Sequence, residues 1–323
     1  MRTLALAALE SLLLVGSGNA ADLTCPSSMT LDALVTCIRA QMPQAASNGY
    51  VAPTPSQRAD WRILVNKMLQ GSCDFAVPVS LEGIVQVRTF TDTGNGRSYC
   101  LLMEVWDQDG DGVVDHGFGT FLVNRDATRE LSHQAVHPIF DSNTEIQAVI
   151  VFKGTDSRSF LMAGAHRNAN SAASACLPAH RESDPSHNVN PMVQATNEEL
   201  LAHYGAASWF AIQWHGMGTD TCPTTDVHLS HGRDDVPPNT KIAVLRAKLL
   251  QHNPTWDVSL PGSGSCGLNA TENMQGRLIN GVAAERVCCT PASGITQKFI
   301  HIEQHTAFRS PSDWIAPVTD AFP

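Results

Sequence analysis

The 323-residue sequence lacks the marks of several common functional classes. Charged residues make up only 16% of the chain and aromatic residues 6%, and Lys and Arg are nowhere gathered into a basic run. The formal net charge is −10. Phosphate binding depends on clustered cations, so we expect no nucleic-acid partner. Beyond the N-terminus no apolar stretch is long enough to cross a bilayer, so we expect no membrane span.

Several short catalytic signatures are also missing. The sequence contains no G-x-S-x-G elbow of a serine hydrolase, no H-E-x-x-H metalloprotease helix and no phosphate-binding P-loop. None of the nine cysteines forms a C-x-x-C pair, which argues against a cysteine zinc knuckle. The apolar fraction of 43% is ordinary for a globular protein, so a sizeable core is available.

The cysteines follow a segment that resembles an export signal. Residues 1–20 combine Arg2, an apolar stretch and a small-residue end at Gly18-Asn19-Ala20, although an amphipathic N-terminal helix also fits. Nine cysteines in an exported chain indicate a disulfide framework with one thiol that is free or pairs with another chain. We expect the adjacent Cys288 and Cys289 to have different partners, and the protein to be secreted or periplasmic.

Composition divides the rest of the chain into three segments. Residues 21–75 show apolar positions at helical spacing and predict a helical N-terminal unit, either a pro-segment or an accessory cap. Residues 76–128 are rich in β-branched residues between Gly and Asp turns. In residues 129–323 strand-like and helix-like segments alternate, which predicts an α/β fold with a mostly parallel sheet flanked by helices.

An acidic turn interrupts the β-rich segment. Asp107, Asp109, Asp111 and Asp115 alternate with Gly110 and Gly112, in a spacing similar to the DxDxDGxxD loops of extracellular calcium-binding repeats. Several carboxylates around one point suit a hard cation such as Ca²⁺. The twelfth position is not the Glu that an EF-hand requires. We predict a structural calcium site here, with an acidic turn that binds no ion as the alternative.

Residues that can bind a metal ion or transfer a proton lie at or near the ends of several predicted strands. His137 ends one strand, Glu145 begins the helix after the next loop, and His215 ends a later strand. Three ligands from His and a carboxylate, with a fourth position for water, are the ligand set of a catalytic zinc. Glu303, in the last strand, is the candidate general base that accepts a proton from that water.

The order of these motifs resembles the zinc amidohydrolases. This group includes N-acetylmuramoyl-L-alanine amidases, N-formylglutamate amidohydrolases and poly-γ-glutamate hydrolases, which are distantly related to zinc carboxypeptidases. The resemblance covers roughly residues 130–310 and implies a mostly parallel sheet between helices. It also implies that His137, Glu145 and His215 bind zinc and that Glu303 is catalytic. The implied activity is hydrolysis of an amide bond near a substrate carboxylate.

The same resemblance suggests residues that bind the substrate. Arg167 lies where these enzymes carry an arginine that holds a carboxylate, and a planar bidentate donor suits that task. Asn170 and Arg277 are further candidates. His137 is followed by Pro-Ile-Phe in place of a glycine-rich loop, so the implied substrate class stays open.

Two alternatives remain at this point. His166, His301 or His305 can replace one of the proposed zinc ligands, because each follows or lies in an apolar segment near the others. The chain can also be a non-catalytic extracellular binding protein that is stabilised by calcium on a hydrolase-like fold. The acidic turn alone favours the binding protein, whereas polar groups at the ends of several strands favour the enzyme.

Overall fold

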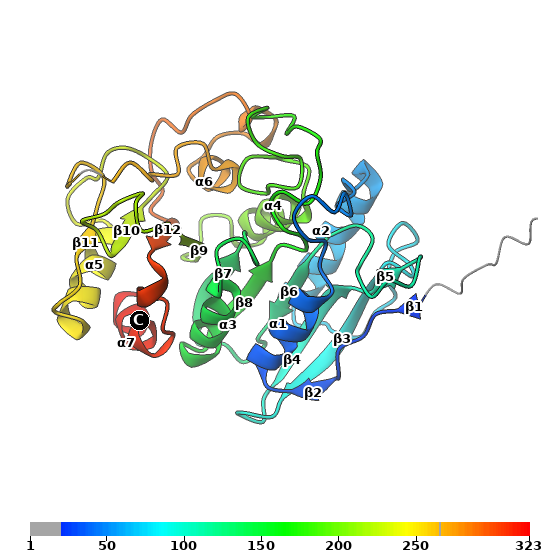
Figure 1. The fold of residues 1–323 in the computed structure, drawn as a ribbon. Coiled ribbons are helices and arrows are strands. Elements are labelled where there is room, and N and C mark those ends of the chain that lie inside the picture. The colour runs from blue at the N-terminus through cyan, green and yellow to red at the C-terminus, as the bar shows by residue number, and fades with distance from the viewer. Residues whose placement is uncertain (1–20, 265) are drawn as a thin grey trace, which may run out of the picture.

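The computed structural model describes residues 21–264 and 266–323, so the predicted signal segment 1–20 lies outside the described residues. The described chain forms one ten-stranded mixed sheet with helices on both faces (Figure 1). This arrangement confirms the predicted α/β fold. The strand order is β11-β10-β12-β9-β7-β8-β6-β4-β3-β2, and a separate two-stranded sheet joins β1 (Ala21–Asp22) to β5 (Trp106–Asp107).

The elements of the main sheet and its helices alternate along the chain. The strands are β2 (Ser28–Met29), β3 (Val85–Asp92), β4 (Ser98–Glu104), β6 (Thr120–Val123), β7 (Arg129–Ala135), β8 (Ser157–Met162), β9 (Phe210–Gly216), β10 (Val227–Ser230), β11 (Val258–Ser259) and β12 (Phe299–Gln304). The helices are α1 (Leu31–Ala40), α2 (Pro55–Leu69), α3 (Thr144–Gly154), α4 (Met192–Tyr204), α5 (Lys241–His252), α6 (Met274–Ile279) and α7 (Ser312–Ala321).

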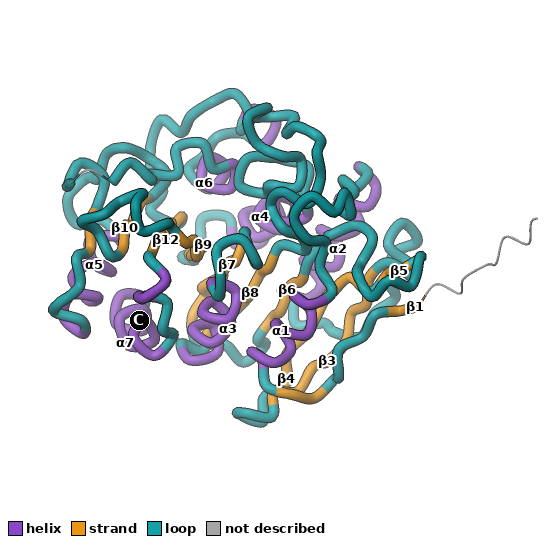
Figure 2. The backbone as a smooth tube through the Cα atoms, in the orientation of Figure 1, coloured by secondary structure: helices purple, strands orange, loops and turns teal. Residues whose placement is uncertain are grey.

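The centre of the sheet is parallel. The neighbouring pairs β8–β7, β7–β9 and β9–β12 all run parallel, whereas β6 joins β8 antiparallel and β10 joins β12 antiparallel. Four consecutive strands therefore end at one edge of the sheet, where ligands of α/β proteins usually bind. Long loops lie beyond this edge (Figure 2).

The helices form two layers, one on each face of the sheet. Helices α1, α3, α5 and α7 share one apolar core, in which Trp214 and Trp314 pack edge to face with ring centroids 4.9 Å apart. Helices α2, α4 and α6 pack on the other face around Trp61, whose indole N–H donates to Thr196. Burying such large aromatic side chains is a major source of stability in a fold of this kind.

The predicted helical unit and β-rich segment belong to the same body as the rest. Helix α2 begins with Pro55 and a capping box between Thr54 and Gln57, which explains why the helix starts there. Strands β3, β4 and β6 extend the main sheet through the β6–β8 pairing. The sheet is therefore continuous across residue 128, where the composition of the sequence changes.

Four disulfides cross-link the described chain. They join Cys25–Cys37, Cys73–Cys100, Cys176–Cys288 and Cys222–Cys266. Cys289 is exposed and is free. Cys288 and Cys289 do not bridge to each other, as expected, but only Cys288 has a disulfide partner. None of the described helices is long and apolar enough to cross a membrane.

Candidate metal centre

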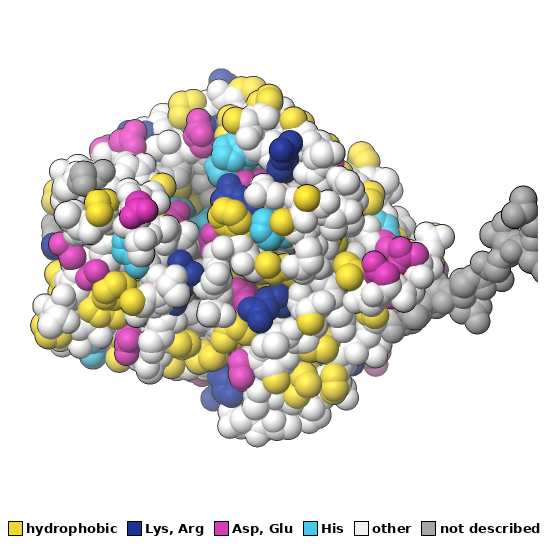
Figure 3. Space-filling view, in the orientation of Figure 1, with side chains coloured by type: hydrophobic (Ala, Val, Ile, Leu, Met, Phe, Trp, Pro, Cys, Tyr) yellow, Lys and Arg dark blue, Asp and Glu magenta, His cyan; other side chains and the backbone are white. Residues whose placement is uncertain are grey.

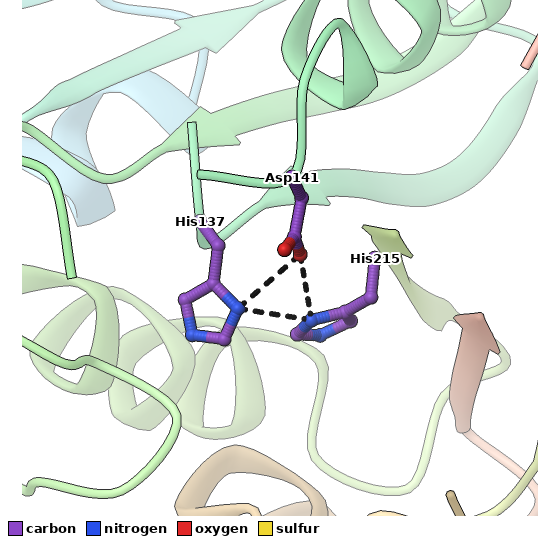
Figure 4. Close-up of side chains that lie close together, drawn as sticks. All are labelled: His137, Asp141 and His215. Carbon is purple, nitrogen blue, oxygen red and sulfur yellow. Dashed lines mark hydrogen bonds and ion pairs between the residues drawn. The ribbon is translucent and has the colours of Figure 1, made fainter. Parts of the chain in front are cut away.

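Three potential metal ligands meet at the carboxyl edge of the parallel strands. His137 follows β7, His215 lies in β9, and Asp141 lies in the loop that leads into α3 (Figure 4). The Nδ1 atoms of the two histidines are 3.2 Å apart. The Asp141 Oδ2 atom is 3.3 Å from Nδ1 of His137 and 3.4 Å from Nδ1 of His215. All three side chains are buried.

This triangle fits a tetrahedral zinc ion. With Zn–N and Zn–O bonds of about 2.0–2.2 Å, the ligand atoms of a tetrahedral site lie about 3.3 Å apart. The three measured separations of 3.2, 3.3 and 3.4 Å agree with that value. Two histidines and one carboxylate also match the ligand chemistry of catalytic zinc, which leaves a fourth position for water.

Glu145 begins α3 as expected, but the structure does not bring it to this triangle. Its carboxylate accepts a hydrogen bond of 2.5 Å from the Arg39 guanidinium of α1, and its side chain is fully buried between the two helices. Glu145 lies four residues after Asp141, in the first turn of α3, and its carboxylate pairs with Arg39 and not with the two histidines. Asp141 is the carboxylate that the geometry supplies in its place. Its position, in the loop directly after a strand that leads to His137, is the sequence signal that could have identified it.

The loop that carries Asp141 is held from several sides. Ile139 and Asn143 have φ angles of 71° and 67°, and a β-branched residue such as Ile rarely adopts that conformation. Arg309 donates to the backbone oxygens of Asp141 and Ser142 at 3.2 and 2.7 Å. A methyl group on Gly216 would overlap that guanidinium, so the glycine after His215 makes room for Arg309. The surroundings therefore fix a strained loop that presents Asp141.

Both histidines of the triangle have a hydrogen-bond partner on the opposite ring nitrogen. The Nε2 atom of His137 is 3.0 Å from Asp184 Oδ1, and Nε2 of His215 is 3.4 Å from Gln213 Oε1. Oxygen acceptors at Nε2 favour the tautomer whose Nδ1 carries the free lone pair. Such partners orient metal-binding histidines and increase their basicity.

A chain of buried amides lies beneath His215. The Gln213 Nε2 atom donates to Gln134 at 3.0 Å, and Gln134 exchanges hydrogen bonds with Asn197 of α4. Asn273 donates to the same Gln213 oxygen that faces His215, at 2.8 Å. The connected side chains are Gln134, Gln194, Asn197, Gln213, Asn273 and Gln275, and all are buried. A connected network of this kind restricts the positions of its members, although the Gln194 Nε2 atom has no hydrogen-bond partner among the described residues.

Burial and the neighbouring charges shift the pKa values of the three triangle side chains in opposite directions. Burial lowers the pKa of His215 to about 4, so this imidazole is neutral. For His137, burial and Arg167 favour the neutral ring, yet Asp184 and Asp141 together raise its pKa above the ordinary value. Burial alone would raise the pKa of Asp141, but His137 and His215 lower it well below its usual range. Asp141 is therefore ionised, as a metal ligand must be.

Glu303 and His301 extend the site from the neighbouring strand. Glu303 is paired in register with His215 across β12 and β9, and its side chain is 12% exposed. Burial, followed by repulsion from Asp141, raises the pKa of Glu303 well above its ordinary value. His301 lies two residues earlier on the same strand face, with its Nε2 atom 3.5 Å from the Glu303 carboxylate. Burial lowers the pKa of His301 well below the ordinary value, so this ring is neutral.

A cleft of about 530 Å³ opens over these groups. The triangle, Glu303, His301 and Arg167 line it, and residues 267–273 line it as well. Histidine, basic and acidic side chains surround a hollow in the middle of one face of the molecule (Figure 3). The cleft thus combines candidate ligands, a candidate base and a cation.

The three predicted substrate-binding residues have different surroundings. Arg167 lines the cleft, pairs with Asp184 and lies over the ring of Phe140 at 5.1 Å. Asn170 lines a neighbouring cleft, and its amide nitrogen donates to Glu182. Arg277 donates to backbone oxygens within the loops after α6 and before it, and it is not among the residues that line either cleft. Its guanidinium therefore supports loop structure.

A second group of potential ligands lies beside the cleft. Nδ1 of His180 and Nδ1 of His187 are 3.5 and 3.0 Å from Asp184 Oδ2. The two rings are stacked at 3.6 Å with an angle of 9° between their planes. Imidazole lone pairs lie in the ring planes, so parallel stacked rings do not converge on one ion. Arg167 also pairs with Asp184, which makes this group a poor cation site.

The acidic turn brings three of its four carboxylates together. Potential ligand atoms of Asp107, Asp109 and Asp115 lie within 4.8 Å of one another. Asp111 lies apart from that group, and its carboxylate accepts from the backbone N–H of Val113. The Asp107 carboxylate accepts from the N–H groups of Gly110 and Gly112. Calcium binding at this turn stays a prediction.

Comparisons with known proteins identify no family for this chain, so the interpretation of the site depends on its geometry. No protein-family model matches the sequence. No curated protein matches it either. Among solved structures, a putative carboxypeptidase of Burkholderia mallei is similar over 84% of this chain and 68% of its own, with 12% sequence identity and a TM-score of 0.35. A likeness at that level carries no argument about activity.

Proposed function

We propose that this protein is an exported zinc-dependent hydrolase that cleaves an amide bond near a carboxylate of its substrate. The observation that carries the proposal is the triangle of His137 Nδ1, Asp141 Oδ2 and His215 Nδ1, with separations of 3.2–3.4 Å. A general base candidate, Glu303, lines the same cleft. The four disulfides agree with an oxidising compartment outside the cytoplasm.

Each group of the proposed site would have a separate role in hydrolysis. A bound zinc ion would lower the pKa of a water molecule and polarise the scissile carbonyl. Glu303 would accept the proton of that water and pass it to the leaving amine, and its raised pKa suits a group that both takes and returns a proton. The neutral His301, 3.5 Å from Glu303, would keep that carboxyl group oriented.

Arg167 would hold the substrate carboxylate. Its guanidinium lines the cleft and forms an ion pair with the buried Asp184. The guanidinium carbon lies 5.1 Å from the centre of the Phe140 ring, and a planar guanidinium can form two parallel hydrogen bonds to a carboxylate. Amides with a free acid group next to the scissile bond are therefore the substrates to test.

The alternative, a non-catalytic binding protein stabilised by calcium, is favoured by the acidic turn with its three close carboxylates. The two functions differ in metal content. A hydrolase binds one zinc per chain at the triangle, whereas the binding protein binds calcium and no stoichiometric zinc.

The first experiment is elemental analysis of the purified protein, with His215→Ala and Glu303→Gln beside it. We expect one zinc per chain in the wild type, none in His215→Ala, and an unchanged zinc content in Glu303→Gln. Glu303→Gln should lose about 10²- to 10⁴-fold in kcat on amide substrates, the usual contribution of a general base. A folded wild type without zinc, or a fully active Glu303→Gln protein, would reject the proposal.

A further inference from the structure

We infer that the second cleft beside the metal centre binds an extended arm of the substrate, beyond the group that Arg167 holds. The inference rests on the proposed function and adds the substrate class: an amide whose acid-bearing side is an oligopeptide-like chain with a further carboxylate. The second cleft has a volume of about 490 Å³, close to the 530 Å³ of the first.

The two clefts are neighbours that share part of their lining. Arg167 and His180 line both of them. Asp184 lines the second cleft, and its carboxylate reaches His137 of the metal triangle at 3.0 Å. A chain that places one carboxylate on Arg167 can therefore continue into the second cleft. A single amino acid would fill the first cleft only.

The N-terminal unit supplies one wall of the second cleft. The loop that follows α1 lines it through Ala45, Ala46 and Asn48. Backbone hydrogen bonds fasten this loop to the segment after β8: Ala46 N–H donates to Asn168 at 2.8 Å, and Asn48 N–H donates to Ala169 at 2.6 Å. The helical unit therefore completes the cleft, a role that fits an integral part of the enzyme better than a removable pro-segment.

The chemistry of the lining favours an anionic ligand rich in carbonyl groups. Asp184 is the only acidic residue among the described residues that line this cleft, and Arg167 and three histidines already contact its carboxylate. Arg181 is exposed and donates one N–H to the Ser171 carbonyl at 3.0 Å. Its remaining N–H groups are free of carboxylate partners among the described residues. Arg181 therefore adds a second cation for a carboxylate, and Asn48 and Asn168 add amide donors for peptide carbonyls.

The test compares two probes and two variants in the Glu303→Gln background, so that binding is measured without turnover. The probes are acetyl-alanine and the acetylated tripeptide Glu-Ala-Ala, both with free C-terminal carboxylates. Arg181→Gln removes the second cation. Ala179→Trp fills the cleft from an exposed position in its lining. The matched controls are Arg125→Gln and Ala206→Trp, at exposed positions outside both clefts.

Calorimetric titration of the zinc-loaded protein should give tighter binding of the tripeptide than of acetyl-alanine. We expect Arg181→Gln to weaken tripeptide binding about tenfold, the usual loss for a charge-assisted hydrogen bond. Ala179→Trp should weaken it by about tenfold or more because the indole occupies the cleft, and both variants should leave acetyl-alanine binding unchanged. The controls should bind both probes as the Glu303→Gln parent protein does. Equal affinity for the two probes, or an unchanged tripeptide affinity in both cleft variants, would overturn the inference. Neither result alters the zinc content or the effect of Glu303→Gln on kcat, which test the proposed function separately.

Discussion

The carboxylate of Asp184 lies 3.0 Å from the Nε2 atom of His137, on the side of the ring that faces away from the metal triangle. The same carboxylate pairs with Arg167. One buried acid therefore orients both a candidate metal ligand and the candidate substrate cation. Although burial alone would raise its pKa, the pKa of Asp184 is lowered well below its usual range by His137 and its other partners, so it is ionised.

Asp184→Asn should weaken zinc binding by about 10- to 100-fold, the usual effect of losing a carboxylate behind a metal-binding histidine. The substitution keeps the shape of the side chain and removes its charge. Competition with a chromogenic chelator measures the zinc affinity. Asp156→Asn, at a surface ion pair with Arg97, is the control and should bind zinc normally. An Asp184→Asn protein with wild-type zinc affinity would exclude this role.

Gly216→Ala should disturb the metal centre although the glycine is not a ligand. The added methyl group would overlap Arg309, which holds the loop of Asp141. We expect a destabilisation of about 1–3 kcal/mol, as for other crowded positions, and a lower zinc affinity. Gly218→Ala is the matched control, because a methyl group there meets only Thr221 at 3.5 Å. Thermal unfolding and chelator competition on both variants separate the two cases.

The sequence predicted the fold well because local patterns and topology agree. The helix expected to begin at Glu145 did form as α3, and the strand-like segments ending near His137 and His215 did become β7 and β9. Parallel neighbours in one sheet end at the same edge, so the meeting of these two histidines followed from the order of strands and helices.

The carboxylate of the candidate triangle could not be predicted in the same way. Whether Asp141 or Glu145 faces the histidines depends on the path of a short loop, which has two residues of positive φ and is held by Arg309 from the far end of the chain. No local periodicity encodes such a contact. The partner Asp184 likewise comes from a segment whose approach only the folded chain defines, whereas Gln213 lies two residues before His215 on the same face of β9.

Acid should destabilise the fold through its buried neutral histidines. Burial lowers the pKa of His231 to about 4, and its ring bonds the Phe299 carbonyl at 2.7 Å. The unfolded chain takes up a proton at this residue below pH of about 6.5, and the folded protein only near pH 4. Above pH 6.5 His231 therefore does not reduce the free energy of unfolding. Between pH 6.5 and pH 4 it lowers that free energy by roughly 1.4 kcal/mol per pH unit.

Urea unfolding at pH 7 and pH 4.5 checks this sign. His231→Gln removes the titrating group, so the variant should lose less stability than the wild type between the two pH values. An equal loss in the two proteins would mean that His231 does not contribute to acid sensitivity.

Asp109→Ala tests the predicted calcium site in the acidic turn. If Asp107, Asp109 and Asp115 bind Ca²⁺, the variant should show a lower melting temperature than the wild type in calcium, with unchanged zinc content. Asp111→Ala, whose carboxylate lies outside the group of three, is the comparison and should retain most of the calcium effect. A wild-type melting curve that is identical with calcium and with chelator would remove the site.

Gln213→Met should weaken zinc binding through His215. The substitution removes the oxygen that faces His215 Nε2 at 3.4 Å, while keeping a side chain of similar volume. Gln134→Met is the control, because Gln134 belongs to the same buried network but does not contact His215.

Both variants leave buried amides without partners, so both should lower thermal stability. Only Gln213→Met should reduce zinc affinity, by about tenfold or more, since it alone frees the ring to adopt the other tautomer. Chelator competition and nitrogen NMR of the His215 ring measure the two effects, and equal zinc affinities in the two variants would assign the network to stability alone.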